Sequence, residues 1–394
     1  MRLAPHPTTR LVASATALLL LTGCSSGSTS PSASGAAVPT SGRSVSSTAT
    51  EPTRIKGAPT ELSALVERVY SGSDLGSTAS KTAAAALEAR TPVSGPISGK
   101  ASTGSWKGQQ VAVVTVGDDV TLAVAAKPGA WRVVGGWWPT LGVPKPALGS
   151  GPRWVLALGS DARKGQPLDH TRADTIQVVG TDGAGGAGLM GMARDLWVPL
   201  SIGGKGKINS AMALGGAGAQ LKTVRSVTRL PIEGYVVIGF TGFRKTVDEL
   251  GGIPIVIPRT VDASHAGILV KKGPQTLTGA EALAYARERK TLPDGDFGRS
   301  RHQGELLLAA AVKARLAGPT AMPLALTTVS RYTRTDLDAE QMLTFVARFY
   351  QVKPAEVGRS VARGAFGWAG GQSIVVLGPQ ARSLFADFAD GNLS

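Results

Sequence analysis

The spacing of apolar positions changes along the first half of the chain. Over residues 61–70 and 81–90 apolar and small residues recur at helical spacing, which predicts two helices. Further on the pattern is that of short β-rich runs separated by turn residues. These predicted strands cover residues 110–116, 120–126 and 131–138. We therefore expect a small α+β accessory unit over residues 58–148.

Predicted strands and helices alternate after a segment rich in proline and glycine at 144–152. Strands are expected at 154–158, 175–180, 188–193, 235–240 and 253–257, and helices at 210–228 and 241–250. Because this order is not a strict βαβ repeat, it predicts a layered α/β domain with a mixed central sheet over residues 149–394. Prolines at both ends of the 253–257 run predict an edge strand there.

The C-terminal third contains a clear helix start. Thr278-Gly-Ala-Glu281 has the pattern of a capping box, and the helix after it is expected to end near Arg287. A loop over 291–298 then leads to a predicted helix over 299–317. Three polar residues share one face at the start of that helix, where backbone N–H groups and the helix dipole favour an anion. They are Arg299, His302 and Gln303.

The charge of the chain narrows the choice of partner. The sequence has 42 Lys and Arg against 27 Asp and Glu, and few of the basic residues lie in the first sixty positions. A basic folded part suits an anionic partner such as nucleic acid, lipid headgroups or phosphorylated glycans. The alternative is that the basic surface only aids solubility.

The N-terminus has the features of an export signal. Arg2 and Arg10 precede an apolar run over 11–21, which is too short to span a bilayer and fits the core of a signal peptide. The run ends in Leu21-Thr-Gly-Cys24, which resembles a bacterial lipobox. This resemblance implies cleavage after residue 23, a diacylglycerol on Cys24 and anchoring to the outer face of the cell membrane. The alternative is a secreted protein with an incidental cysteine.

Residues 24–57 are expected to form a flexible linker. They consist mainly of Ser, Thr, Gly, Pro and Ala, so they have too little apolar surface to offset the entropy lost on ordering. An exported and tethered protein does not meet the chromosome, so nucleic acid is excluded as the partner. Cys24 is the only cysteine in the chain, which excludes an internal disulfide.

Carboxylates stand beside arginines at several places that follow apolar runs. Aspartate supplies the hard oxygen ligands that Mg²⁺ prefers, and arginine makes bidentate contacts with phosphate. The pattern therefore suits a polyanion held partly through a metal, although any single Arg–Asp neighbour could be a surface ion pair. The motifs are Gly159-Ser-Asp161-Ala-Arg163, Arg172-Ala-Asp174-Thr, Ala193-Arg194-Asp195, Lys207-Ile-Asn209 and the block from Tyr285 to Gln303.

In this order, the motifs resemble those of the LytR-CpsA-Psr family, and the resemblance covers about residues 150–394. It implies a three-layer α/β/α sandwich. It also implies a phosphotransferase that moves a glycan from a polyprenyl diphosphate carrier onto peptidoglycan or a related wall polymer. Such a reaction depends on positioned cations more than on a nucleophilic side chain. The lipid tail of the carrier requires an apolar tunnel between sheet and helices.

The resemblance also implies roles for individual residues. Asp161 and Asp174 are the expected ligands of Mg²⁺ or Mn²⁺. Asp296 either orients the arginines or assists proton removal from the acceptor hydroxyl, and His302 either contacts phosphate or lies on the helix surface. The residues expected to bind the diphosphate are Arg172, Arg194, Arg287, Arg289 and Arg299, supported by Lys207 and Gln303.

Two other functions fit the same residues. In a polyprenyl diphosphatase, water replaces the sugar hydroxyl. A non-catalytic carrier-binding regulator would keep the fold without the reaction. The presence of both Asp161 and Asp174 argues against the regulator, because binding alone has little need for two such carboxylates.

Overall fold

The computed structural model describes residues 53–393. The predicted signal peptide, the predicted lipidation site Cys24 and most of the predicted linker lie outside the described residues. Residues Arg54–Lys56, which we expected at the end of the linker, form strand β1. Within residues 53–393, no helix is long and apolar enough to cross a membrane.

The N-terminal part of the described chain is a five-stranded sheet with two helices. Its strands follow the order β1-β2-β3-β4-β5, with β1 parallel to β2 and the others antiparallel. Leu62, Leu65 and Val69 of α1 are buried in a core that they share with this sheet. The elements are α1 (Thr60–Ser71), α2 (Lys81–Leu87), β2 (Ser98–Trp106), β3 (Gln109–Val116), β4 (Asp119–Ala125) and β5 (Trp131–Trp137).

The second part is built on a six-stranded mixed sheet of order β16-β11-β6-β7-β8-β17. The pairs β11–β6 and β8–β17 are parallel, and β16–β11, β6–β7 and β7–β8 are antiparallel. The predicted mixed α/β fold is thus confirmed. The strands are β6 (Arg153–Ser160), β7 (Ala173–Thr181), β8 (Ala187–Met192), β11 (Gly234–Gly239), β16 (Thr333–Thr335) and β17 (Val357–Ala362).

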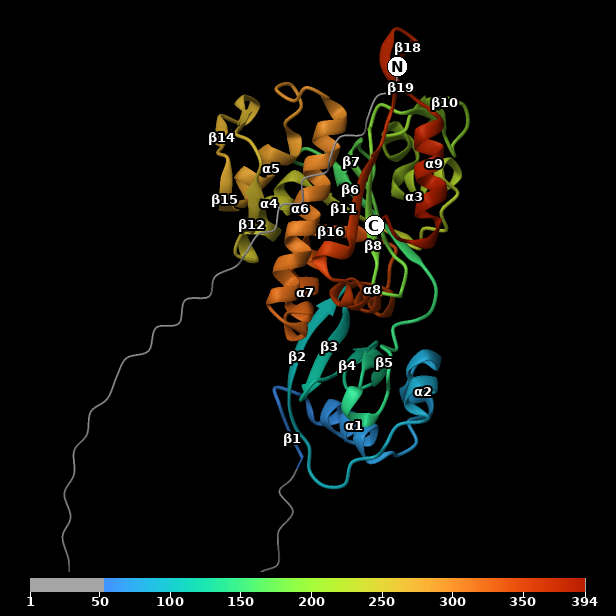
Figure 1. The fold of residues 1–394 in the computed structure, drawn as a ribbon, viewed down its shortest axis with the longest axis vertical. Coiled ribbons are helices and arrows are strands. Elements are labelled where there is room, and N and C mark those ends of the chain that lie inside the picture. Colours follow the sequence, from blue (N-terminus) through green and yellow to red (C-terminus); the bar gives the residue numbers. More distant parts are fainter. Residues whose placement is uncertain (1–52, 394) are drawn as a thin grey trace, which may run out of the picture. The chain divides into compact units, whose positions relative to one another are not determined.

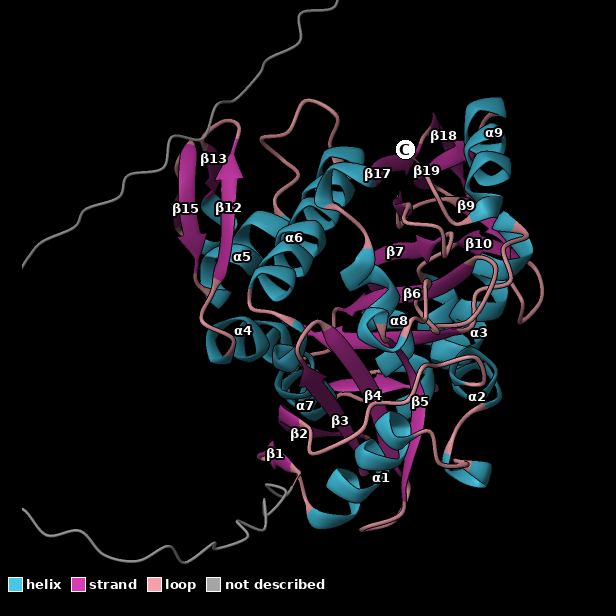
Figure 2. Cartoon of the chain, turned by 60° about the horizontal axis from the view of Figure 1, so that its bottom comes forward, coloured by secondary structure: helices cyan, strands magenta, loops and turns pink. Residues whose placement is uncertain are grey.

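Helices cover both faces of this sheet, as Figure 1 and Figure 2 show. Alternate residues of β6 point to opposite faces, so Leu156 packs with α3 (Ser210–Thr228) and α9 (Pro379–Asp387), while Ala157 faces the other helices. Those other helices are α4 (Phe240–Glu249), α5 (Gly279–Arg287), α6 (Asp296–Leu316), α7 (Met322–Tyr332) and α8 (Ala339–Gln351).

The remaining strands form small two-stranded sheets outside the central one. We predicted an edge strand over 253–257, but β12 (Ile253–Ile257) lies outside the central sheet and pairs only with β15 (Gly273–Leu277). The others are β9 (Trp197–Pro199) with β10 (Lys205–Lys207), β13 (Val261–Ala263) with β14 (Ile268–Val270), and β18 (Gly364–Ala369) with β19 (Gln372–Leu377).

Candidate functional site

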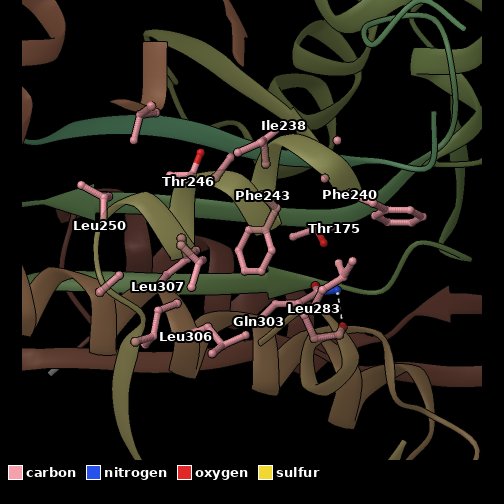
Figure 3. Close-up of a pocket in the computed structure, with 18 of the residues that line it drawn as sticks. Thr175, Ile238, Phe240, Phe243, Thr246, Leu250, Leu283, Gln303, Leu306 and Leu307 are labelled. Atoms are coloured by element: carbon pink, nitrogen blue, oxygen red, sulfur yellow. Dashed lines mark hydrogen bonds between the residues drawn. The ribbon is translucent and has the colours of Figure 1, made fainter. Parts of the chain in front are cut away.

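A cavity of about 680 Å³ lies between the central sheet and helices α4, α5, α6 and α7. This volume is within the usual range of small-molecule sites. Figure 3 shows apolar side chains from three helices converging on it. They are Phe243 of α4, Leu250 directly after α4, Leu283 of α5, and Leu306 and Leu307 of α6.

Helix α6 runs along the cavity. It lines one half of the cavity with polar side chains and the other half with apolar ones. Arg299 and Gln303 line the cavity from the first turns of α6, whereas Ala310 and Ala314 line it from the last turns. A lysine in the second half, Lys313, donates hydrogen bonds to backbone carbonyls at the end of α4 and is thereby satisfied. The cavity therefore joins an arginine-rich end to an apolar end.

Three separate segments bring charged residues together at the arginine-rich end. Asp174 lies near the start of β7, and its Oδ1 accepts a hydrogen bond from Arg194 Nη1 at 2.7 Å. Asp296, at the start of α6, accepts a hydrogen bond from the Arg194 backbone N–H at 3.1 Å through Oδ2. Its Oδ1 lies 2.5 Å from Arg299 Nη2. The two carboxylates thus hold two arginines at fixed positions.

Burial and charge act in opposite directions on these arginines. Burial opposes the charge of Arg194, but Asp174, Asp296 and Asp195 together outweigh it and the pKa of Arg194 is raised. Arg299 is only 5% exposed, and burial lowers its pKa although Asp296 opposes that effect. Arg299 thus depends on its carboxylate partner, and an anionic ligand would relieve part of its desolvation.

Two further arginines line the cavity where α5 ends. Arg287 is the last residue of α5, and its guanidinium carbon lies 4.4 Å from the centroid of the Phe240 ring. Glu288 is buried between Arg287 and Arg289, while both arginines are exposed. This spacing leaves both guanidinium groups free to meet one ligand.

Glu288 fixes the turn that carries these arginines. Its Oε2 lies 3.0 Å from His265 Nδ1, and its Oε1 accepts the Thr291 backbone N–H at 2.9 Å. Burial works against ionisation of this carboxyl, but the Thr291 N–H and the His265 ring outweigh it, so the pKa of Glu288 is below its ordinary value. The pair of His265 and Glu288 was not predicted, because no sequence motif joins these residues, which lie 23 positions apart.

Several predicted site residues lie beside the cavity rather than in its lining. Asp161 Oδ1 accepts the Arg172 backbone N–H at 2.9 Å and closes the loop between β6 and β7. Lys207 Nζ lies 3.0 Å from Asp195 Oδ1. Gln303 does line the cavity, and its Nε2 donates to the Ala286 carbonyl at 3.2 Å, as drawn in Figure 3. The predicted site residues among the lining are Asp174, Arg194, Arg287, Arg289, Arg299 and Gln303.

The expectation that His302 lies on the helix surface is wrong. The side chain is buried and its ring stacks on Tyr285, with centroids 3.9 Å apart. Its Nδ1 lies 3.2 Å from the Tyr285 carbonyl oxygen, and it is not among the residues that line the cavity. His302 therefore joins α5 to α6 as a core residue, because Tyr285 in turn donates to Glu305 at 2.7 Å.

The chemistry of the donors decides whether a divalent metal fits. Strand pairing of Ser160 with Ala173 and of Gly159 with Thr175 places Asp161 and Asp174 at the same end of β6 and β7. Among residues 53–393, no group of three or more His, Cys, Asp or Glu could hold a metal. Two carboxylates suit Mg²⁺ only when a substrate completes its ligands, which is how Mg²⁺ is often bound beside phosphates. The residues fit such a shared site.

The mixed α/β sandwich and its cavity define a domain suited to an amphipathic anion, with an apolar tail and a charged head. Residues 144–385 match the LytR_cpsA_psr family, and the chain belongs to that family. The structure of TagV from Bacillus subtilis is 27% identical and superposes with a TM-score of 0.52, over 61% of this chain and 98% of the chain in that structure. The structure of TagT bound to LI-WTA, at 24% identity and a TM-score of 0.52, covers 62% of this chain and 92% of TagT and shows the same fold.

Curated relatives match over part of their length. Regulatory protein MsrR of Staphylococcus aureus is 38% identical over 165 residues, which are 41% of this chain and 49% of MsrR. TagV of B. subtilis, a polyisoprenyl-teichoic acid–peptidoglycan teichoic acid transferase, is 38% identical over 167 residues, or 39% of this chain and 42% of TagV. The chain therefore spans about half the length of the curated relatives it matches.

Proposed function

We propose that the protein is a phosphotransferase that moves a glycopolymer from a polyprenyl diphosphate carrier onto peptidoglycan or a related wall polymer. The observation that carries this proposal is the cavity, in which an apolar half continues into an end lined by four arginines. A polyprenyl diphosphate has a matching arrangement, because its apolar tail is joined to a multiply charged head. The transferase name of the relative TagV supports the proposal.

In this reaction the acceptor hydroxyl oxygen forms a new bond to the phosphorus that carries the glycan. The bond from that phosphorus to the bridging oxygen breaks, polyprenyl phosphate leaves, and the hydroxyl proton passes to a base or to solvent. Arg194 and Arg299 would stabilise charge on the phosphoryl oxygens. Asp296 Oδ2 already accepts the Arg194 backbone N–H and Oδ1 forms an ion pair with Arg299, so we assign Asp296 to the positioning of these residues rather than to proton removal.

Mg²⁺ or Mn²⁺, held by Asp161 and Asp174, would neutralise charge on the diphosphate. Arg287 and Arg289 would bind the same group from the end of α5, and Lys207 and Arg172 would support the loops around it. We further propose that Cys24 carries the lipid anchor, which would place the site at the outer face of the cell membrane beside its substrate.

Transfer of labelled glycan from a lipid carrier to a wall acceptor tests the proposal. The wild-type protein should transfer glycan, a chelator should stop the reaction, and Mg²⁺ should restore it. Asp161→Asn and Asp174→Asn should fold and yet lose transfer, while Asp262→Asn, a change of an exposed aspartate on β13, should retain it.

The products separate the alternatives. Release of free glycan phosphate without transfer would show a diphosphatase. Carrier binding without any turnover would show a regulator, the role that the name of MsrR suggests for that relative. Wild-type turnover by both Asn variants in the presence of chelator would refute the metal-assisted mechanism.

A further inference from the structure

Helix α7 separates the cavity from the N-terminal sheet and uses a different face for each. Leu324, Ala325 and Val329 line the cavity. Pro323 and Thr327, four positions apart on the same helix, meet strand β2 of the N-terminal unit. Figure 1 shows α7 beside β2 and β3. One side of α7 is thus a cavity wall and the other a docking surface.

Strand β2 holds α7 through its backbone. The Ser105 N–H donates to Thr327 Oγ1 at 2.8 Å, and the Lys107 N–H donates to Ser330 Oγ at 3.0 Å. Strand β1 pairs with β2 only up to Lys100, so within residues 53–393 the later edge of β2 has no strand partner, and α7 covers it. The contact satisfies backbone groups that would otherwise be exposed on a sheet edge.

The apolar anchor of α7 also lies in the N-terminal unit. Met322 and Leu326 are buried in one core with Val111 and Val113 of β3. Trp106 is fully buried in the same core, and its indole Nε1 donates to the Leu337 carbonyl at 2.9 Å. Helix α7 therefore shares a buried apolar core with the accessory sheet.

Gly104 leaves no space at this contact. A Cβ atom at Gly104 would lie 2.3 Å from the Pro323 carbonyl oxygen and 2.5 Å from Thr327 Oγ1. One of these atoms belongs to the backbone of α7, so the helix and the strand would have to separate by roughly 1 Å to reach ordinary contact distance. The position of α7 is thus set by its direct contact with β2.

We propose that the accessory unit over residues 58–148 fixes the wall at the apolar end of the cavity and so determines which length of isoprenoid chain the cavity accepts. This inference rests on the proposed function, because it takes the cavity to hold the carrier tail. A packed contact transmits a shift in β2 to α7 instead of absorbing it. The accessory unit acts here as a positioning element and does not touch the charged end.

Gly104→Ala tests the inference with the smallest possible change. The added methyl group should push α7 toward the cavity and remove apolar contact with a long tail. Affinity for decaprenyl phosphate should fall about tenfold, while affinity for farnesyl phosphate, whose short tail needs less of the cavity, should change less than about twofold. Thr103→Val, an exposed neighbour on β2, is the matched control and should leave both affinities unchanged.

The outcomes distinguish this inference from the proposed function. If wild-type protein binds neither phosphate, the proposed function is wrong. If it binds both and folded Gly104→Ala keeps the wild-type ratio of affinities, the role of the accessory unit is refuted.

A measurement on the wild type covers the case in which Gly104→Ala does not fold. Decaprenyl phosphate should slow hydrogen exchange of the backbone amides of residues 103–107, at the end of β2, and farnesyl phosphate should not. Equal protection by both ligands, or protection by neither, would overturn the inference.

Discussion

Replacing Asp296 by Asn would remove the counter-charge of a buried arginine without changing the shape of the side chain. The Asp296 and Arg299 side chains are 9% and 6% exposed, and their charged atoms lie 2.5 Å apart. Burial already disfavours the charged form of Arg299, since it lowers the pKa of that residue. In the variant the guanidinium of Arg299 would stay buried and lose the negative charge that compensates for its burial.

The loss of stability can be bounded from this geometry. Breaking a buried ion pair by removing one partner typically destabilises a protein by about 3–5 kcal/mol. Asp174 also attracts Arg299, although it is hydrogen-bonded to Arg194, so part of the compensation remains. We therefore expect Asp296→Asn to lower the free energy of unfolding by about 3 kcal/mol, at the low end of that range. Combining it with Arg299→Met should recover much of the loss, because no charge then remains unpaired.

Urea unfolding of the wild type and the variants measures this effect. The control is Asp294→Asn, whose partner Arg301 is 40% exposed, so it should change stability by less than about 1 kcal/mol. Inorganic pyrophosphate should raise the melting temperature of Asp296→Asn more than that of the wild type, because the anion replaces the missing carboxylate. If the free energy of unfolding of Asp296→Asn lies within about 1 kcal/mol of the wild-type value, Arg299 does not depend on Asp296 for its stability.

Three further predictions concern binding, pH and anchoring. Arg287→Lys or Arg289→Lys should weaken polyprenyl phosphate binding roughly tenfold by titration, because lysine lacks the bidentate fork, and unchanged affinity in both would place the anion elsewhere. Burial lowers the pKa of His302 below its ordinary 6.5, so the unfolded chain takes up this proton first. The free energy of unfolding should therefore keep its full value above about pH 6.5 and fall as the pH drops below it. His302→Gln should reduce this dependence on pH when unfolding is measured across the same range. Cys24→Ser should block lipidation and retard signal-peptide processing, and normal processing with unchanged membrane attachment would contradict the lipoprotein hypothesis.

Elements whose ends are set by neighbouring residues could be predicted from short sequence motifs. The capping box at Thr278 and Glu281 is present and starts α5. By contrast, α7 was not predicted, because Pro319 and Pro323 resemble a loop, although proline is tolerated in the first turn of a helix. Strand β17 was also missed, since its parallel partner β8 is remote in the sequence and its own pattern of Val, Gly and Arg is weak.

The start of α6 also differs from the prediction. We predicted a loop up to residue 298, yet the helix begins at Asp296, because Gly295 turns the chain with a φ of 52° just before it. This difference carries Asp296 into the first helical turn, where it reaches both Arg299 and the Arg194 backbone. Charged residues could be predicted as candidates from their motifs. Which carboxylate pairs with which arginine depends on tertiary contacts that the sequence does not display.

Helix α6 carries both the arginine-rich start and the apolar end of the cavity, and this has a consequence for turnover. From Arg299 to Ala314 the helix spans roughly 22 Å at 1.5 Å per residue, and both residues line the cavity. In the proposed reaction the tail is the same in the carrier substrate and in the lipid product. Its contacts with the second half of α6 therefore favour binding of both equally and do not lower the barrier of the chemical step. The spent carrier should leave slowly and compete with fresh substrate, so release of the lipid product, rather than transfer, should limit the steady-state rate.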